Sequence, residues 1–229
     1  MSPVEPAKTP IRFPDPRSSG RRGIVAVGED FRPGTLLSAY RAGIFPWPHD
    51  GEGDEKVVAW FSPHRRATLP LGALQWSRSL RRTLRRHGFR ISVNTAFREV
   101  MEACGSVREE GTWIIPNLVE GYVALHELGW AHSLEIWEGT ELVGGIYGIA
   151  IGRAFSAESM FHRRTDASKI AFATLTERLR DGGYSLFDAQ VMNPHIESLG
   201  CRPVARDTFL SELAVAQATE PPLPISAWP

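Results

Sequence analysis

The chain has 229 residues and a formal net charge of zero, and 42% of its residues are hydrophobic. This is the composition of a globular protein, and the length favours one large domain with a smaller one attached. We expect no membrane span, because no stretch approaches about 18 consecutive apolar residues, and no secretory signal, because residues 1–10 lack an apolar core. Cys104 and Cys201 lie far apart, which excludes a disulfide scaffold and a cysteine zinc site and indicates a reducing, cytoplasmic environment.

The N-terminal part predicts a flexible segment followed by a small α/β domain. Residues 1–22 are rich in Pro, Ser, Gly and Arg, a composition typical of loosely packed chain. Residues 35–43 predict a short helix that ends in glycine, and residues 57–61 predict a strand. We therefore expect three units, a flexible segment over residues 1–22, a small domain over residues 23–70 and a larger domain over residues 71–229.

An arginine-rich amphipathic helix is predicted over residues 76–87. Its arginines fall within one arc of the helix, and its apolar residues fall on the opposite arc. The arginines are Arg78, Arg81, Arg82, Arg85 and Arg86. No Asp or Glu lies between residues 65 and 90 to neutralise this row, and like charges four residues apart repel each other. A solvated surface helix is the alternative, but the lack of interleaved acids favours phosphate binding, which guanidinium groups suit.

From residue 89 the predicted elements follow the order β-α-α-β-β-β-α-β-α-β-α. The predicted strands include residues 131–138, 141–151, 154–161 and 184–190. Asp166 is expected to cap the helix over residues 167–180. This is the element order of the GNAT acyltransferase fold, a mixed sheet with helices on both faces. We therefore predict an α+β chain with a GNAT-like domain.

Polar residues interrupt two of the apolar strands. Asp188 and Gln190 are two residues apart and are expected to share one face of their strand. Glu158 and Met160 are expected to share a face in the same way. Buried carboxylates are costly unless they are paired. The functional interpretation is a cleft where parallel strands diverge and where Glu158, Asp188 and Gln190 meet a polar substrate, and a structural hydrogen-bond network is the alternative.

Familiar sites for other chemistry are missing from the sequence. Metal-ligand spacings, a nucleophile triad, a nucleotide-binding loop, zinc fingers and a basic zipper do not occur, so we expect neither a metal nor a DNA-binding fold. GNAT enzymes carry a glycine-rich pyrophosphate loop for coenzyme A, whereas residues 162–169 contain no glycine. If an acyl group is transferred, its carrier is expected to be another molecule, and the arginine row suggests a nucleic acid.

Several sequence blocks occur together in an order that is specific to one family. The blocks are residues 37–47, 60–63, 110–114, 125–135, 142–148, 158–161, 167–169 and 187–190, followed by His195 and residues 198–200. On these blocks the chain resembles the leucyl/phenylalanyl-tRNA–protein transferases.

The resemblance implies an aminoacyltransferase that uses no ATP, metal or other cofactor. Such an enzyme takes leucine, phenylalanine or sometimes methionine from its tRNA ester and joins it to the N-terminal Lys or Arg of a protein, which marks that protein for N-degron proteolysis. Exchange of an ester for an amide is downhill, so the enzyme has to position the amine, manage its proton and stabilise the oxyanion. We expect a cytoplasmic monomer without a membrane or DNA partner.

The resemblance also implies roles for individual residues. Asp188 and Gln190 resemble the pair proposed to bind the attacking amine, and we expect Asp188 to accept its proton and Gln190 to orient it. Glu158 resembles the acid that holds the aminoacyl-adenosine end. Trp47 and Trp113 match the site for the terminal adenosine. The apolar side-chain pocket is expected to contain Ile146, Met160 and Phe172. The basic cluster for the tRNA acceptor stem is matched by Arg78, Arg82, Arg85 and Arg86.

Three positions depart from the family's pattern. Ala157 replaces a usual glycine, Asp166 replaces an asparagine, and Phe61 stands where a second tryptophan is common. Ala157 leaves the amino-acid preference open. Two alternatives to the transferase are a coenzyme A-dependent N-acetyltransferase, which saturable acetyl-CoA binding would favour, and a non-catalytic N-degron or tRNA-binding module, which would bind without turnover.

Overall fold

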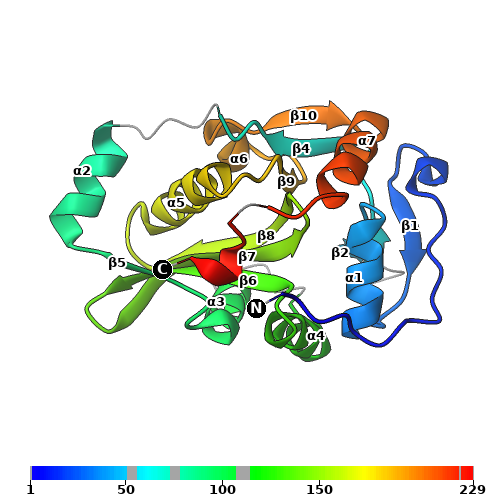
Figure 1. Cartoon of the computed structure of the whole chain (residues 1–229), viewed down its shortest axis with the longest axis horizontal. Coiled ribbons are helices and arrows are strands. Elements are labelled where there is room, and N and C mark those ends of the chain that lie inside the picture. Colours follow the sequence, from blue (N-terminus) through cyan, green and yellow to red (C-terminus); the bar gives the residue numbers. More distant parts are fainter. Residues whose placement is uncertain (1, 51–55, 73–77, 107–113, 222, 229) are drawn as a thin grey trace.

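The computed structural model describes residues 2–50, 56–72, 78–106, 114–221 and 223–228. A three-stranded antiparallel sheet of order β1-β3-β2 occupies the N-terminal part (Figure 1). Its strands are β1 (Ile24–Val27), β2 (Phe45–Asp50) and β3 (Lys56–Phe61). A seven-stranded sheet of order β10-β4-β9-β8-β7-β6-β5 forms the rest of the β-structure.

The seven-stranded sheet is mixed. Strands β8 and β9 pair in parallel, and the other neighbouring strands pair antiparallel. The strands are β4 (Arg65–Leu69), β5 (Arg90–Val93), β6 (Ala131–Glu138), β7 (Glu141–Ile151), β8 (Ala154–His162), β9 (Leu186–Gln190) and β10 (Arg202–Ala205). From β5 onward the order of elements is the predicted one, and the prediction of a mixed sheet flanked by helices is confirmed.

Helices cover both faces of this sheet (Figure 1). One face carries α1 (Pro33–Arg41), α3 (Phe97–Ser106) and α4 (Pro116–Glu127), whose apolar residues form one core cluster with Tyr147 and Phe161 of the sheet. The other carries α2 (Arg78–His87) and α5 (Ala167–Asp181), which pack on Ile146, Phe155 and Phe187. The shorter elements are α6 (Pro194–Ser198), α7 (Arg206–Gln217) and the 3₁₀ helices Pro16–Ser19 and Ile225–Ala227.

Strand β4 connects the N-terminal part to the large sheet. It lies between β10 and β9, although the sequence assigns its residues to the small domain over residues 23–70. Residues 2–22, expected to be flexible, contact the body of the protein: the indole of Trp130 donates to the carbonyl of Val4 at 2.8 Å, and Arg206 donates to the carbonyl of Pro16 at 2.7 Å. The domain boundaries and the flexibility of this segment stay predictions.

Asp166 precedes α5 but does not cap it. Its φ of 67° places it in the left-handed region, and its side chain makes no capping hydrogen bond. The carboxylate instead accepts from Thr83 and from Lys169, each at 3.2 Å. The prediction of a cap is wrong, because an N-cap needs extended backbone to direct its side chain at the first turn.

Candidate active site

The candidate site is a cavity where strands β8 and β9 diverge. Their parallel pairing ends at Ser156 and Asp188, after which β8 continues along β7 and β9 along β4. The divergence leaves a cavity of about 230 Å³. Its lining consists of residues 157–160 and 189–191 together with Trp47, Ile146, Phe172, Asn193, His195 and Ile196. A cleft at diverging parallel strands is therefore present, as the sequence predicts.

A β-bulge lies in the wall of the cavity at Glu158. On β7, Tyr147 pairs with Ser159 and the next residue, Gly148, pairs with Ala157. Glu158 is therefore the extra residue of the bulge, an irregularity that redirects a side chain.

The bulge separates the side chains of Glu158 and Met160. Glu158 accepts a hydrogen bond from Tyr122 of α4, whereas Met160 packs in the core on the side of α5. The prediction that these two residues share a face is wrong, because the alternation of side chains holds only in a regular strand.

Asp188 is enclosed by hydrogen-bond donors. Its Oδ1 accepts from Arg66 Nε at 2.7 Å and from the backbone N–H of Gln190 at 2.9 Å. Its Oδ2 accepts from Arg66 Nη2 at 2.6 Å and from Ser156 Oγ at 3.1 Å. The side chain of Asp188 is 0% exposed and that of Arg66 is 1% exposed. This is a bidentate buried ion pair, and all four accepting positions of the carboxylate are occupied.

Arg66 is held from several directions. Its guanidinium carbon lies 4.4 Å from the ring centre of Phe45 and 4.3 Å from that of Phe209. Its Nη1 donates to the carbonyl of Gly43 at 3.0 Å. Stacking between two rings and hydrogen bonding at three nitrogens compensate the desolvation of the guanidinium and fix its position.

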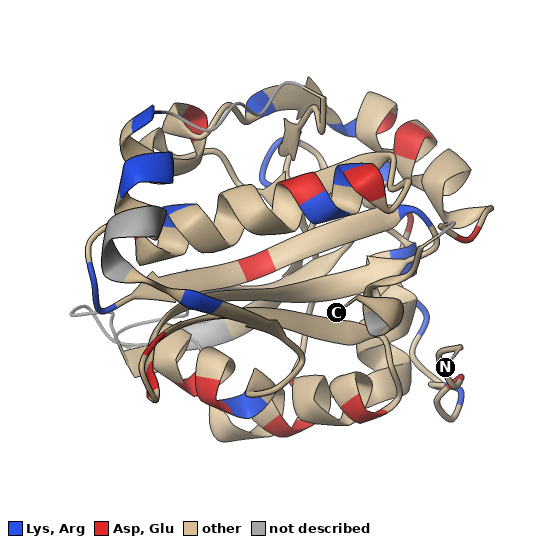
Figure 2. Ribbon diagram, turned by 60° about the vertical axis from the view of Figure 1, so that its left-hand side comes forward, with Lys and Arg blue, Asp and Glu red and all other residues tan. Residues whose placement is uncertain are grey.

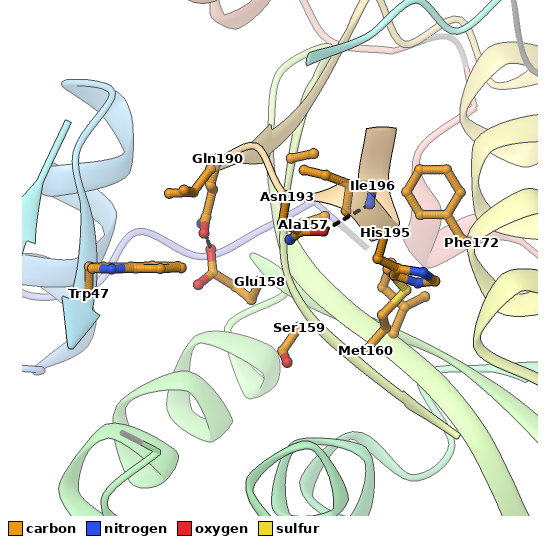
Figure 3. A pocket seen from close by; sticks show the side chains of 13 residues that line it. Trp47, Ala157, Glu158, Ser159, Met160, Phe172, Gln190, Asn193, His195 and Ile196 are labelled. Carbon is orange, nitrogen blue, oxygen red and sulfur yellow. Dashed lines mark hydrogen bonds between the residues drawn. The ribbon is translucent and has the colours of Figure 1, made fainter. Parts of the chain in front are cut away.

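Gln190 connects the ion pair to the cavity. It lies on the same face of β9 as Asp188, as predicted, whereas Phe187 and Ala189 pack in the core beneath α5. Its φ is 63°, an uncommon conformation for a residue with a side chain, and its backbone N–H is held by Asp188. Its Nε2 donates to Glu158 Oε1 at 2.5 Å (Figure 3).

Glu158 lies at the cavity surface and is partly exposed. Tyr122 donates to its Oε2 at 3.1 Å, and the hydroxyl of Tyr122 is also hydrogen-bonded to that of Tyr40. Burial raises the pKa of Glu158 to about 7, and the hydroxyls of Tyr40 and Tyr122 limit this rise because they favour the charged form. The group therefore changes its charge near neutral pH.

The cavity has a polar end and an apolar end. Figure 3 shows Trp47, Glu158 and Gln190 on one side and Met160 and Phe172, with His195 beside them, on the other. The three residues predicted to form an apolar pocket, Ile146, Met160 and Phe172, all line it, and Ala157 does so as well. Trp47 lies on β2 of the N-terminal sheet and stacks on Phe61 at 6.3 Å between ring centres. Trp113 lies outside the described residues.

The exposed face of α2 is basic. Arg78, Arg81 and Arg82 are exposed, whereas Leu80 is buried and Leu84 packs on the core beneath α5. Figure 2 shows these basic turns at one end of the molecule, beside α5. The side chains of Arg85 and Arg86 lie outside the described part of the structure, as does Trp76. The predicted amphipathic helix is present over Arg78–His87.

The residues that hold the polar groups of the site, Arg66, Tyr40 and Tyr122, were not predicted from the sequence. A basic residue inside the apolar run of residues 66–69 was a usable signal, because a buried cation in a strand requires an acid such as Asp188 as a partner. The tyrosines gave no comparable signal, because a tyrosine on the buried face of a helix is ordinary core material.

Among the described residues, no group of three or more His, Cys, Asp or Glu side chains could hold a metal ion. No helix in the described ranges is both long and apolar enough to cross a membrane.

Two family models match the chain. Residues 29–64 match the leucyl/phenylalanyl-tRNA protein transferase N-terminal domain, and residues 68–214 match leucyl/phenylalanyl-tRNA protein transferase. The chain belongs to the leucyl/phenylalanyl-tRNA–protein transferase family. A leucyl/phenylalanyl-tRNA–protein transferase of Shewanella denitrificans is 48% identical over 206 residues, which cover 90% of this chain and 86% of the relative. One of Proteus mirabilis is 46% identical over 208 residues, which cover 89% of this chain and 87% of the relative.

The solved structures that are similar to this chain are distant from it in sequence. The crystal structure of FemX has a TM-score of 0.49 at 12% identity and covers 75% of this chain and 66% of its own. A GCN5-related N-acetyltransferase from Kribbella flavida has a TM-score of 0.39 at 13% identity and covers 76% of this chain and 61% of its own. Membership of the transferase family identifies the chain as an aminoacyltransferase, whose substrates are aminoacyl-tRNA and acceptor proteins.

Proposed function

We propose that the cavity between β8 and β9 is the site where leucine or phenylalanine passes from tRNA to the N-terminal Arg or Lys of an acceptor protein. The observation that carries this proposal is the arrangement of the cavity walls. The hydrogen-bonded pair Glu158 and Gln190 lies beside an apolar end formed by Ile146, Met160 and Phe172. A reactive ester and an amine need polar groups, and the side chain that is transferred needs an apolar pocket beside them.

The apolar end suits an unbranched aliphatic or aromatic side chain. A cavity of about 230 Å³ is small, so shape decides which side chains enter it. Leucine and phenylalanine carry an unbranched Cβ, and methionine shares this feature, which makes it a further substrate. Discrimination by such a pocket amounts to about 1–3 kcal/mol per methylene group.

The tRNA is bound at two places in this proposal. The terminal adenosine lies at the polar end, where Trp47 offers a ring face for stacking; the resemblance assigns the same role to Trp113, which lies outside the described residues. The acceptor stem lies along α2, where Arg78 and Arg82 contact phosphates, a role that the resemblance also assigns to Arg85 and Arg86. Phosphate contacts carry no sequence information, which suits an enzyme that accepts more than one tRNA.

The transfer exchanges an ester for an amide and is driven by that difference. Glu158 and Gln190 bind and orient the acceptor amine, whose pKa lies near 8, so a weak base is sufficient near neutral pH. Asp188 accepts a hydrogen bond from the backbone N–H of Gln190 and so helps to position this pair. We further propose that the enzyme acts as a cytoplasmic monomer.

A direct transfer assay tests this function. The purified protein is incubated with labelled leucyl-tRNA and a peptide that begins with Arg, and a matched peptide that begins with Ala serves as the control. We expect labelled product with the first peptide alone and a loss of about a hundredfold in the Glu158→Ala variant. Saturable binding of both substrates without product would indicate a binding module, and transfer of acetyl groups from acetyl-CoA would indicate an N-acetyltransferase.

A further inference from the structure

We infer that Glu158, and not Asp188, accepts the proton of the attacking amine, and that Arg66 is a positioning residue that acts through Asp188 on Gln190. This inference rests on the proposed function, because it concerns the same cavity and the same transfer.

Asp188 is not exposed to the cavity and has no free accepting position for this proton. It is 0% exposed and does not belong to the lining of the cavity. Arg66, Ser156 and the backbone of Gln190 already supply four hydrogen bonds to it. An ionised carboxylate has about four accepting positions, so an amine would have to displace one of these donors. Protonation would also leave the buried guanidinium of Arg66 without its counter-charge.

Glu158, by contrast, is exposed to the cavity and has a free accepting position. The residue is partly exposed and lines the cavity. Gln190 donates to its Oε1 and Tyr122 to its Oε2, while the hydroxyl of Tyr40 is hydrogen-bonded to that of Tyr122, which leaves accepting positions on Glu158 for a proton carried by substrate. The β-bulge gives this orientation, because a regular strand would direct residue 158 differently.

Arg66 acts on Glu158 through two intermediate residues. Its bidentate grip orients the carboxylate of Asp188, and Oδ1 of that carboxylate holds the backbone N–H of Gln190 at 2.9 Å. This contact supports the left-handed backbone at Gln190, whose φ is 63°. The backbone in turn directs the side-chain amide to Glu158. Strained backbone of this kind persists where the surroundings over-determine it.

During the transfer Glu158 takes up one proton and later releases it. The amine nitrogen forms a bond to the ester carbonyl carbon, and one of its protons passes to the Glu158 carboxylate. The bond between that carbon and the ribose oxygen then breaks, and the leaving oxygen takes the proton from Glu158. The products are an amide and a free ribose hydroxyl, and Glu158 is a carboxylate again.

The electrostatic surroundings of Glu158 agree with this role. The groups that face it are Tyr40 of α1, Tyr122 of α4, Asp188 of β9 and Arg66 of β4. Burial and the charge of Asp188 raise the pKa of Glu158, the two hydroxyls and Arg66 lower it, and together these effects place it at about 7. A base with this pKa is ionised in part at neutral pH and close in strength to the amine it serves.

A pH profile distinguishes the two carboxylates. The transfer rate at saturating substrates is measured from about pH 5.5 to 9 for the wild type, Glu158→Gln and Asp188→Asn, with a peptide whose amine has been titrated separately. We expect an inflection near pH 7 in the wild type that Glu158→Gln lacks; in Asp188→Asn the inflection should persist at a lower rate and move to lower pH, because the charge of Asp188 raises the pKa of Glu158. An inflection that survives in Glu158→Gln, or that vanishes in Asp188→Asn, would overturn the inference. A wild type without transfer at any pH would contradict the proposed function itself.

A measurement on the wild-type protein does not depend on the folding of Asp188→Asn. With ¹³C at the glutamate carboxyl carbons, NMR should show one signal that titrates near pH 7 and is absent from Glu158→Gln. If no glutamate carboxyl titrates there, Glu158 is not the base.

Two conservative variants test the positioning role. Arg66→Lys keeps the charge but loses the bidentate geometry. We expect its kcat to fall by between about tenfold and a hundredfold while its KM for leucyl-tRNA and the inflection near pH 7 are kept. Arg206→Lys is the matched control, because Arg206 is also a buried arginine but binds carbonyl groups of Pro16, Gly20 and Pro63. An unchanged kcat in Arg66→Lys, or an equal loss in the control, would overturn the role of Arg66.

Discussion

Tyr40 on α1 and Tyr122 on α4 are hydrogen-bonded through their hydroxyls, and Tyr122 donates in turn to Glu158 at 3.1 Å. The two tyrosines are 82 residues apart in sequence, and both are buried. The pair therefore connects α1 to the wall of the cavity. The two hydroxyls also lower the pKa of Glu158, which keeps it at about 7 instead of a higher value.

Removal of one of these hydroxyls should shift the pH dependence of transfer. A hydroxyl that donates to a carboxylate lowers the pKa of that carboxyl group, so Tyr122→Phe should raise the pKa of Glu158 above its value of about 7. The inflection of the transfer rate then moves to higher pH, and activity at pH 7 falls more than activity at pH 9. Tyr184→Phe, which changes a buried tyrosine outside the lining of the cavity, should leave the inflection in place. A Tyr122→Phe profile that shifts to lower pH would contradict this account.

Glu158 should reduce the stability of the folded protein at neutral pH. Its pKa is about 7 in the folded chain and 4.5 in the unfolded chain, so between these values the folded state binds more protons. The free energy of unfolding therefore falls as pH rises from about 4.5 to about 7, and the loss is complete above that range.

Glu158→Gln removes this penalty because it carries no charge at any pH. Its midpoint of thermal unfolding should exceed that of the wild type at pH 8, and the difference should shrink towards pH 4.5. The exposed Glu212→Gln should show no such trend. A Glu158→Gln protein that is less stable than the wild type at pH 8 but not at pH 4.5 would show that the carboxylate stabilises the fold.

The sequence predicts the individual helices and strands of this chain better than it predicts which strands pair with each other. The order of elements from β5 onward is correct, because each strand and helix there has its own periodic pattern and its own turn signals. The place of β4 between β10 and β9 was not predictable. Its pairing joins Thr68 to Asp188 across 120 residues of sequence, and nothing local to β4 encodes that contact.

In the candidate site, too, features that depend on local sequence were predicted, whereas contacts between residues far apart in sequence were not. Ile146, Met160 and Gln190 lie in the family blocks, Phe172 was predicted with Ile146 and Met160 as part of the apolar pocket, and all four line the cavity. The expected role of Asp188 as the proton acceptor does not fit its burial. A carboxylate on the correct strand face is visible in the sequence, whereas Arg66, which saturates it, lies 122 residues away. The bulge at Glu158 was hidden too, because a single unpaired residue leaves no periodic trace.

The width of the apolar end should set the preference between leucine and phenylalanine. Met160→Ala removes side-chain atoms from the cavity wall and leaves space for a larger substrate side chain. We expect kcat/KM for phenylalanyl-tRNA relative to leucyl-tRNA to rise by about tenfold, measured with both substrates in competition. Met160→Leu conserves volume and should change the ratio little. An unchanged ratio in Met160→Ala would place the substrate side chain elsewhere.

The exposed arginines of α2 should contribute to tRNA affinity in proportion to the phosphates they neutralise. The double variant Arg78→Ala with Arg82→Ala removes two exposed cations without changing the buried face of the helix at Leu80. Each lost phosphate contact should reduce the slope of log K against log salt concentration by about 1 and weaken binding of all accepted tRNAs alike.

The rate at saturating tRNA should remain that of the wild type, because α2 contributes no side chain to the lining of the cavity within the described residues. A double variant with alanine at Arg41 and Arg98, exposed arginines of α1 and α3 on the other face of the sheet, is the matched control and should keep the full salt dependence. If the α2 variant keeps the wild-type slope while the control loses it, the acceptor stem lies against the α1 and α3 face. The basic row on α2 would then be an ordinary solvated surface, which is the alternative that the sequence left open.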